Sequence, residues 1–171
     1  MRAERVYREA VQSPVETGYA REALERVQLR NYAVELRFVK VRPGGPRGPI
    51  AVTLVLPDGR SVQTPPHRAG RRAHLDARFV VTANAYDDRP VSARVFRLPE
   101  REGANDPPFD LGTVRFALSD LLGRGALTLE SGVVDEVRFE IAPTALPAGE
   151  LFGLVPVPAA APPPPPPPRR K

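Results

Sequence analysis

The chain has 171 residues, a formal net charge of +5 and no cysteine, and this length fits one domain with extensions. The lack of cysteine excludes disulfides, thiolate metal sites and cysteine nucleophiles. No apolar run is long enough to cross a bilayer, and the charged N-terminus does not resemble a secretory signal. We therefore expect a protein that is neither secreted nor membrane-spanning, and that is intracellular or associated with a virion. Proline accounts for 22 residues, which argues against a mainly helical fold.

Residues 1–30 have helical periodicity and are expected to form an N-terminal helical arm. The segment 13–16 (SPVE) is typical of a helix start, because the serine and glutamate side chains can each bond the other's backbone amide. An apolar stripe follows at intervals of four residues: Val15, Tyr19, Ala23 and Val27. We expect this stripe either to pack on its own domain or to dock on a partner.

From residue 31 to residue 141 the apolar period changes to two, which is typical of strands with one buried face. Strands are predicted over 32–38, 50–56, 61–64, 75–81, 91–95, 114–118 and 137–141, with a helical turn at 119–122. About seven or eight short strands separated by Pro/Gly turns predict an all-β fold, an antiparallel β-sandwich. Five large apolar residues should lie between its two sheets: Leu36, Phe38, Val95, Phe116 and Phe139.

Residues 142–171 leave the strand pattern and are expected to form an extended Pro-rich C-terminal arm. A short apolar clump at 151–155 predicts an edge strand or a docking peptide, and its candidate docking residues are Leu151, Phe152 and Leu154. Prolines 162–168 predict a polyproline II helix. Pro164, Pro167 and Arg169 fit the PxxP-plus-Arg pattern that SH3-type grooves bind. A spacer without such a reader is the alternative.

The segment 91–122 (VSARVFRLPEREGANDPPFDLGTVRFALSDLL) resembles the C-two (C2) domain family, the calcium- and lipid-binding β-sandwich of synaptotagmins and protein kinase C. The matching positions are Val95-Phe96, Leu111-Gly112 and 119–122 (SDLL), and the resemblance covers about residues 31–141. The family's two calcium-binding aspartates fall on Arg97 and Pro99, which cannot ligate calcium. The resemblance therefore implies a calcium-independent member that contacts proteins or anionic lipids. Three acids nearby in the sequence could still form a different calcium site: Asp87, Asp106 and Asp110.

The sequence contains no recognisable catalytic motif. Its two histidines, His67 and His74, lie around an Arg-rich turn without a carboxylate pair beside them. Asp76 could orient His74, but strand alternation places both on the solvent face. We expect no enzymatic activity, no catalytic or metal site and no cofactor.

Basic residues concentrate between positions 37 and 72, where Glu35 and Asp58 are the only acids close by in sequence. If the sandwich brings these strands together, the charges would merge into one patch that attracts carboxylates or phosphates. We call this set the predicted basic patch: Arg37, Lys40, Arg42, Arg60, Arg68, Arg71 and Arg72. A solvated face with charged loops is the alternative. Arg47 lies in the same segment.

These features favour a non-enzymatic structural or adaptor subunit of a larger assembly, either a virion component or a cytoskeletal or ciliary complex. Protein subunits would then bind the terminal arms and the predicted basic patch. The alternative is a calcium-independent peripheral module that binds anionic lipid membranes. It ranks second because the loops 43–49 and 64–72 lack a Leu, Phe or Trp that could insert into a bilayer. Nucleic acid is a weaker candidate partner, since no aromatic residues interleave the basic ones.

Overall fold

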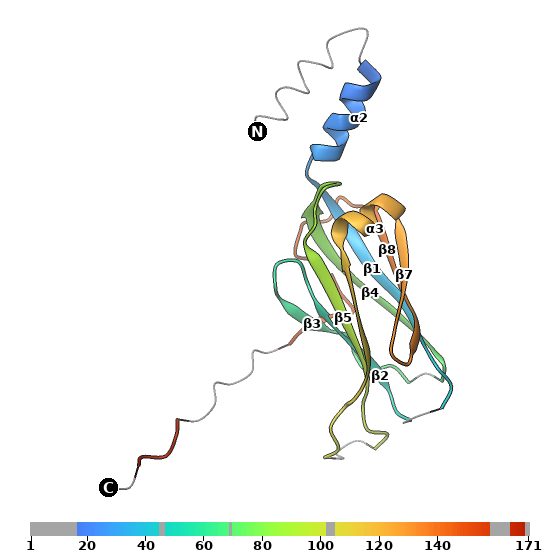
Figure 1. Ribbon diagram of the computed structural model, residues 1–171, viewed down its shortest axis with the longest axis vertical. Coiled ribbons are helices and arrows are strands. Elements are labelled where there is room, and N and C mark those ends of the chain that lie inside the picture. Colours follow the sequence, from blue (N-terminus) through green and yellow to red (C-terminus); the bar gives the residue numbers. More distant parts are fainter. Residues whose placement is uncertain (1–16, 45–46, 69, 102–104, 158–164, 170–171) are drawn as a thin grey trace.

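The computed structural model describes residues 17–44, 47–68, 70–101, 105–157 and 165–169. Within these ranges ten strands form two antiparallel sheets of five strands each, which pack as a sandwich (Figure 1). The first sheet has the order β7 (Ala126–Ser131), β8 (Val134–Pro143), β1 (Arg30–Val41), β4 (Arg72–Ala83) and β9 (Leu151–Phe152). The second has the order β10 (Val155–Pro156), β3 (Ser61–Gln63), β2 (Ile50–Val55), β5 (Pro90–Arg97) and β6 (Phe109–Ala117). The predicted β-sandwich is confirmed.

The core lies between the two sheets, as the alternation of apolar and polar residues predicted. Leu36, Val95, Phe116 and Phe139 are all buried. The rings of Phe116 and Phe139 reach across from opposite sheets, with their centroids 4.8 Å apart. Phe38 is the exception, because it is only half-buried and is not a core residue.

A β-bulge at Arg37 explains why the prediction for Phe38 is wrong. Leu36 and Phe38 of β1 are paired with Phe139 and Arg138, which are consecutive residues of β8, so β1 has one extra residue at this point. A one-residue shift moves every following side chain to the opposite face. Val39 therefore points into the core. The Phe38 ring lies on the outer face, 4.5 Å from the Arg72 guanidinium.

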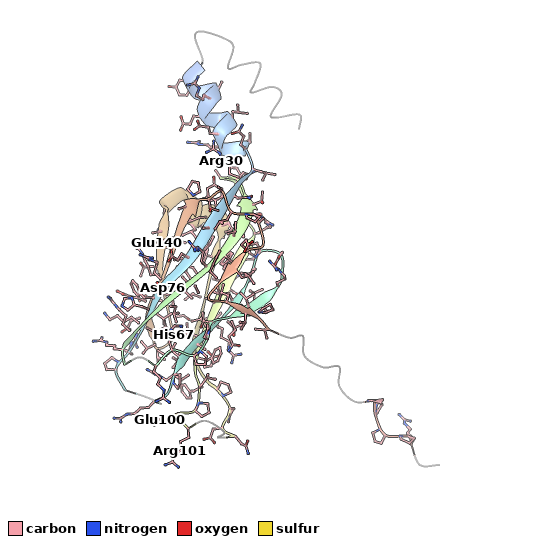
Figure 2. All side chains as sticks on the ribbon, turned by 180° about the vertical axis from the view of Figure 1, so that it is seen from behind. Arg30, His67, Asp76, Glu100, Arg101 and Glu140 are labelled. Carbon is pink, nitrogen blue, oxygen red and sulfur yellow. The ribbon has the colours of Figure 1, made fainter. Side chains whose placement is uncertain are left out.

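The two ends of the sandwich differ in what they carry. Three loops lie at one end, at the bottom of Figure 1: 42–49 between β1 and β2, 64–71 between β3 and β4, and 98–108 between β5 and β6. We call this the loop end, and Figure 2 shows Glu100 and Arg101 at its tip. The opposite end carries helix α2 (Thr17–Val27) and helix α3 (Leu118–Arg124). Helix α3 includes the predicted helical turn and ends at Gly125, which has a φ of 76°.

Helix α2 projects from the sandwich and joins it near the turn between β4 and β5 (Figure 1). The backbone N–H of Ala85 donates to the carbonyl of Arg26 over 3.1 Å. The predicted helix start at 13–16 and Val15 lie outside the described residues. Tyr19 is 85% exposed, whereas Ala20 is 7% exposed, so the covered face lies one residue further around the helix than the predicted stripe. No helix in the described part of the chain is both long and apolar enough to cross a membrane.

The segment after β8 belongs to both sheets. Leu151 and Phe152 of β9 pair with Phe79 and Arg78 of β4, and β10 then pairs with β3. Leu154, between the two short strands, is buried. Of the two possibilities that the sequence left open for 151–155, the structure shows edge strands rather than a free docking peptide, and the sandwich extends past residue 141.

Candidate functional site

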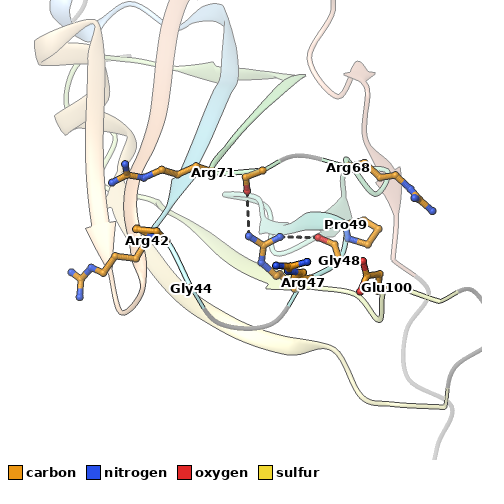
Figure 3. A pocket seen from close by; sticks show the side chains of 11 residues that line it. Arg42, Gly44, Arg47, Gly48, Pro49, Arg68, Arg71 and Glu100 are labelled. Atoms are coloured by element: carbon orange, nitrogen blue, oxygen red, sulfur yellow. Dashed lines mark hydrogen bonds between the residues drawn. The ribbon is translucent and has the colours of Figure 1, made fainter.

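A pocket of about 740 Å³ lies at the loop end, between the three loops (Figure 3). Five arginines line it: Arg42, Arg47, Arg68, Arg71 and Arg97. Glu100 is the only carboxylate among the lining residues in the described part of the chain. Figure 3 shows Arg42 and Arg71 on one side of the pocket, Arg68 on the other side and Arg47 between them. In this view the side chains of Arg42, Arg71 and Arg68 extend outward, so the positive charge is spread around the rim of the pocket.

Arg97 is the buried arginine of this pocket. It ends strand β5 and is 9% exposed. Its Nη1 donates to the carbonyl of Gly48 over 2.7 Å and its Nη2 to the carbonyl of Gly70 over 3.4 Å, shown as dashed lines in Figure 3. These bonds connect the loop 42–49 to the loop 64–71. Burial lowers the pKa of the Arg97 guanidinium, and no carboxylate of the described residues forms an ion pair with it.

Gly48 allows this close packing. Its φ is 140°, and a Cβ atom at this position would lie 2.0 Å from the carbonyl oxygen of Leu98. The N–H of Leu98 also donates to the carbonyl of Pro49 over 2.9 Å. Only glycine can bring the first loop this near to the end of β5, and this approach places the Gly48 carbonyl against Arg97.

The exposed arginines of the pocket are only partly neutralised. Arg42 Nε lies 3.1 Å from one carboxylate oxygen of Asp135, and Arg71 Nη2 lies 3.7 Å from the other. Arg42 and Arg71 thus share a single carboxylate, and both remain more than half exposed. The pocket lining thus includes five arginines and Glu100, and Asp135 pairs with two of these arginines from outside the lining. The excess charge makes this pocket the candidate functional site, and its chemistry suits an anionic ligand.

An aromatic side chain lies beside the pocket. Phe109 begins β6 and is 51% exposed. It lines a smaller neighbouring hollow of about 410 Å³ together with Pro107, and this hollow shares Arg47 and Arg97 with the first pocket. The two loops that the sequence places among the basic residues, 43–49 and 64–72, contain no Leu, Phe or Trp that could insert. The structure places Phe109, which directly follows the third loop, beside the pocket.

The predicted basic patch is not one surface, because β8 supplies acids that were distant in the sequence. Arg37 contacts Glu35 at 2.8 Å and Glu140 at 3.3 Å. Arg72 lies 3.7 Å from Glu136. Glu136 is also the residue of β8 that pairs with Lys40 of β1. The outer face of the first sheet is therefore a mixed surface of both signs.

The other members of the predicted basic patch lie in two further places. Arg60 is in the β2–β3 turn, where its Nε is 2.7 Å from Asp58. Arg42, Arg68 and Arg71 are at the loop end and line the pocket. Only these three of the predicted residues line the same pocket, and the expectation of one merged patch is corrected accordingly.

The predicted docking and polyproline residues lie elsewhere in the chain. Tyr19 and Val27 are on α2, Tyr19 exposed and Val27 half-buried. Leu151 packs partly against the core, and Phe152 is exposed with Arg78 stacked on its ring at 4.4 Å. Pro164 lies outside the described residues. Pro167 and Arg169 are exposed and have no helix or strand structure.

The acids that could have formed a calcium site are not brought together. Asp87 lies in the β4–β5 turn at the end opposite the loop end, where Arg89 pairs with it at 2.7 Å. The Arg89 side chain, through its hydrogen bonds, holds the pKa of the Asp87 carboxyl below its usual range. Asp110 is at the loop end but is paired with Arg94 at 3.0 Å. Asp106 lines the smaller hollow.

The histidines are also separated from any acid cluster. His67 pairs with Ile50 through backbone hydrogen bonds, and His74 is exposed on the outer face beside the Phe38 ring. Asp76 is exposed on the same face, as the alternation predicted. Among the residues that the structure describes, no group of three or more His, Cys, Asp or Glu is arranged to hold a metal ion.

Millimolar calcium is expected to leave the melting temperature unchanged, because Asp110 is already paired with Arg94 and Asp87 is at the other end of the molecule. A ligand at 100 times its dissociation constant would raise the free energy of unfolding by about 2.7 kcal/mol. Differential scanning calorimetry with calcium and with EGTA would detect such a change. A stabilisation that EGTA reverses would show that Asp106 and Asp110 form a site despite Arg94.

The sequence contained a signal for Arg97 that the analysis did not use. Val91, Ala93 and Val95 alternate on the inward face of β5, and continuing that period places Arg97 on the same face. An arginine on an inward face at a strand end is a candidate for a buried charge. The resemblance to the C2 family indicated only that Arg97 replaces a calcium ligand.

The comparisons with known proteins concern the fold. No protein-family model matches the sequence, and no curated protein matches it. Among solved structures, a C2 domain of plant extended synaptotagmin 1, the one designated A, superimposes with a TM-score of 0.50 at 13% identity, over 69% of this chain and 96% of that one. Human GIVD cytosolic phospholipase A2, solved with methyl gamma-linolenyl fluorophosphonate, gives 0.50 at 12% identity, over 68% of this chain and 17% of the phospholipase. The chain therefore has a C2-like β-sandwich fold.

Proposed function

We propose that this protein is a calcium-independent peripheral module that binds anionic lipid membranes through its loop end. The observation that carries the proposal is the loop-end pocket, whose lining includes five arginines and one carboxylate among the described residues. Basic residues near a membrane surface contribute about 1 kcal/mol each to binding of anionic lipids. The resemblance to the C2 family, whose members bind lipids, supports the same function. The assembly-subunit hypothesis, ranked first from the sequence, has no comparable support from this site.

The exposed aromatic residue strengthens the proposal. Electrostatic attraction alone is weak at physiological salt, where the Debye length is about 8 Å. An apolar side chain that enters the interface adds a contribution that salt does not screen. Phe109 is half-exposed beside the pocket. The loops 43–49 and 64–72 offer no residue to insert into a bilayer, but Phe109 could do so.

Vesicle co-sedimentation in the presence of EGTA tests the proposal. Binding should increase with the anionic lipid content and weaken as salt is added. The double variant Arg47→Ala/Arg68→Ala removes two charges from the pocket without breaking an ion pair of the described residues. It should weaken binding by about 2 kcal/mol, which is roughly 30-fold.

Arg60→Ala is the control, because it removes one positive charge, paired with Asp58, from a turn away from the pocket. Its effect on the dissociation constant for vesicles should be about an order of magnitude smaller than the effect of the double variant. If the unmodified protein does not bind anionic vesicles at low salt, the proposal is wrong. Co-purification with a protein partner that is lost in the Arg47→Ala/Arg68→Ala variant would then favour the assembly-subunit hypothesis.

A further inference from the structure

A proline-rich segment follows the last strand of the sandwich and belongs to neither sheet. The sequence has seven consecutive prolines at 162–168, followed by Arg169 and Arg170, and we call residues 162–170 the proline segment. Its described part, residues 165–169, is exposed at every position and has no helix or strand structure. Proline has no N–H to donate and a fixed φ, so such a run can neither join a sheet nor continue a helix. The described part is therefore accessible to another molecule.

Consecutive prolines give this segment a shape before it binds anything. They favour the polyproline II conformation, which has three residues per turn and no internal hydrogen bonds. Prolines three positions apart, such as Pro165 and Pro168, then present their rings on one face, and the backbone carbonyls are free to accept. Because the φ angles are already fixed, binding costs little conformational entropy. A groove lined by aromatic side chains fits the rings, and its Tyr O–H and Trp N–H groups can donate to the carbonyls.

The arginines beside the prolines indicate which kind of groove fits. A guanidinium pairs with a carboxylate through two parallel hydrogen bonds, so the groove should have carboxylates at one end. The residues before the run, 158–161 (PAAA), carry no charge. The positive charge therefore fixes the direction in which the segment lies in the groove. An SH3-type groove is the reader of PxxP segments that has this combination of aromatic and acidic side chains.

The proline segment contains the PxxP-plus-Arg pattern twice, in two registers that differ by one residue. The two sets are Pro164, Pro167 and Arg169 and, one position further on, Pro165, Pro168 and Arg170. Both sets have the same spacing along a polyproline II helix. A groove can therefore bind in either register, and the loss of one arginine leaves the other register intact.

We infer that the proline segment is a ligand for an SH3-type groove, which binds prolines three positions apart and the arginine that follows them. This inference is independent of the membrane function, because it uses no residue of the loop end. The N–H of Val157 donates to the carbonyl of Ser61 over 2.9 Å, and this is where the chain leaves the second sheet. From Val157 to Pro165 the chain can span up to about 26 Å. A domain of about 60 residues has a radius of gyration of about 10 Å, so it has room to bind beside the sandwich.

Calorimetric titration of the full chain with a panel of isolated SH3 domains tests the inference. We expect at least one domain to bind with a dissociation constant of about 100 µM or lower. The variant Pro167→Ala/Pro168→Ala removes one proline from each register and should weaken that binding by about tenfold or more. The matched control, Pro162→Ala/Pro163→Ala, makes the same change outside both registers. It should leave the dissociation constant within about twofold.

The arginines have a separate test, because the two registers can replace each other. Arg169→Ala should weaken binding by less than about threefold, whereas Arg169→Ala/Arg170→Ala should weaken it by about tenfold or more. Arg169→Lys/Arg170→Lys keeps the charge but loses the planar fork, and should weaken binding by about threefold or more. Since the described part of the segment is exposed, the melting temperature should be the same in all these variants.

The outcomes are distinguishable from those of the proposed function, since the titrations contain no lipid. If no SH3 domain of the panel binds, the inference is wrong whether or not the protein binds vesicles. Binding that survives in Pro167→Ala/Pro168→Ala also overturns it. If Arg169→Ala/Arg170→Ala loses vesicle binding but keeps its affinity for the SH3 domain, these arginines contact lipid and the inferred pairing with carboxylates is wrong.

One further measurement links the two proposals. If both are correct, the unmodified protein should carry the bound SH3 domain into the pellet with anionic vesicles. The Pro167→Ala/Pro168→Ala variant should sediment with the vesicles and leave the SH3 domain in the supernatant. An SH3 domain that sediments equally with this variant would contradict the inferred role of the prolines.

Discussion

Phe139→Ala should lower the free energy of unfolding by about 3–5 kcal/mol. The side chain is fully buried on β8, and its ring contacts Phe116 of the other sheet. Truncation therefore removes buried apolar area, leaves a cavity and breaks an aromatic pair that connects the two layers. A domain of this size has a total stability of about 5–15 kcal/mol, so the loss is a large share of it. Urea unfolding followed by circular dichroism measures the change.

Phe38→Ala is the matched control, because it makes the same truncation on the outer face. The bulge at Arg37 places Phe38 against Arg72 and His74 instead of in the core. Its loss should cost about 1 kcal/mol, the magnitude of an exposed cation–π contact with partial burial. Equal destabilisation by the two variants would contradict the register that the bulge defines.

Gly112→Ala should lower the free energy of unfolding by about 2–4 kcal/mol, since it combines backbone strain with overpacking. Gly112 has a φ of 153°, and a Cβ atom there would lie 2.5 Å from the carbonyl oxygen of Ser131. At this point β6 of the second sheet approaches the β7–β8 turn of the first, and the N–H of Val133 donates to the carbonyl of Leu111 over 3.2 Å. The added methyl group would push the two layers apart at this edge.

Gly123→Ala makes the same substitution where there is room for it. Gly123 lies in α3, and a Cβ atom there would meet nothing within 4 Å. Because alanine favours the helix by about 1 kcal/mol over glycine, this variant should be neutral or slightly more stable in thermal unfolding. If Gly112→Ala were as well tolerated as Gly123→Ala, that result would contradict the close packing of the two sheets at Gly112.

Most of the fold follows from residue patterns that act locally. The alternation in β5, β6 and β8 reports directly which face is buried, and one of the predicted Pro/Gly turns, at 56–60, joins β2 to β3. Phe38 could not be placed in this way, because a bulge depends on how β1 pairs with β8 and not on the composition of β1. The same holds for β9 and β10, each of which has two residues and gains its order only from a neighbouring strand.

The site was harder to predict than the fold, because charge is neutralised through space. Asp135, Glu136 and Glu140 lie far along the chain from the arginines that they contact. A count of charges along the sequence leaves these acids out, and therefore overestimates the net positive charge of the predicted basic patch on the first sheet. It also missed the contribution of β5, whose last residue, Arg97, completes the pocket.

The short strands β9 and β10 have a consequence for how this protein behaves in a crowded solution. An unpaired strand at the edge of a sheet is a template onto which another chain can add. Here one short segment covers β4 of the first sheet and then β3 of the second, and β10 includes a proline that has no N–H to donate. Another strand could pair with β4 at Arg78 and Phe79, or with β3, only by displacing residues 151–156. This side of the sandwich is thus a poorer template for edge-to-edge polymerisation and for partners that bind by β-augmentation than bare β4 and β3 edges would be.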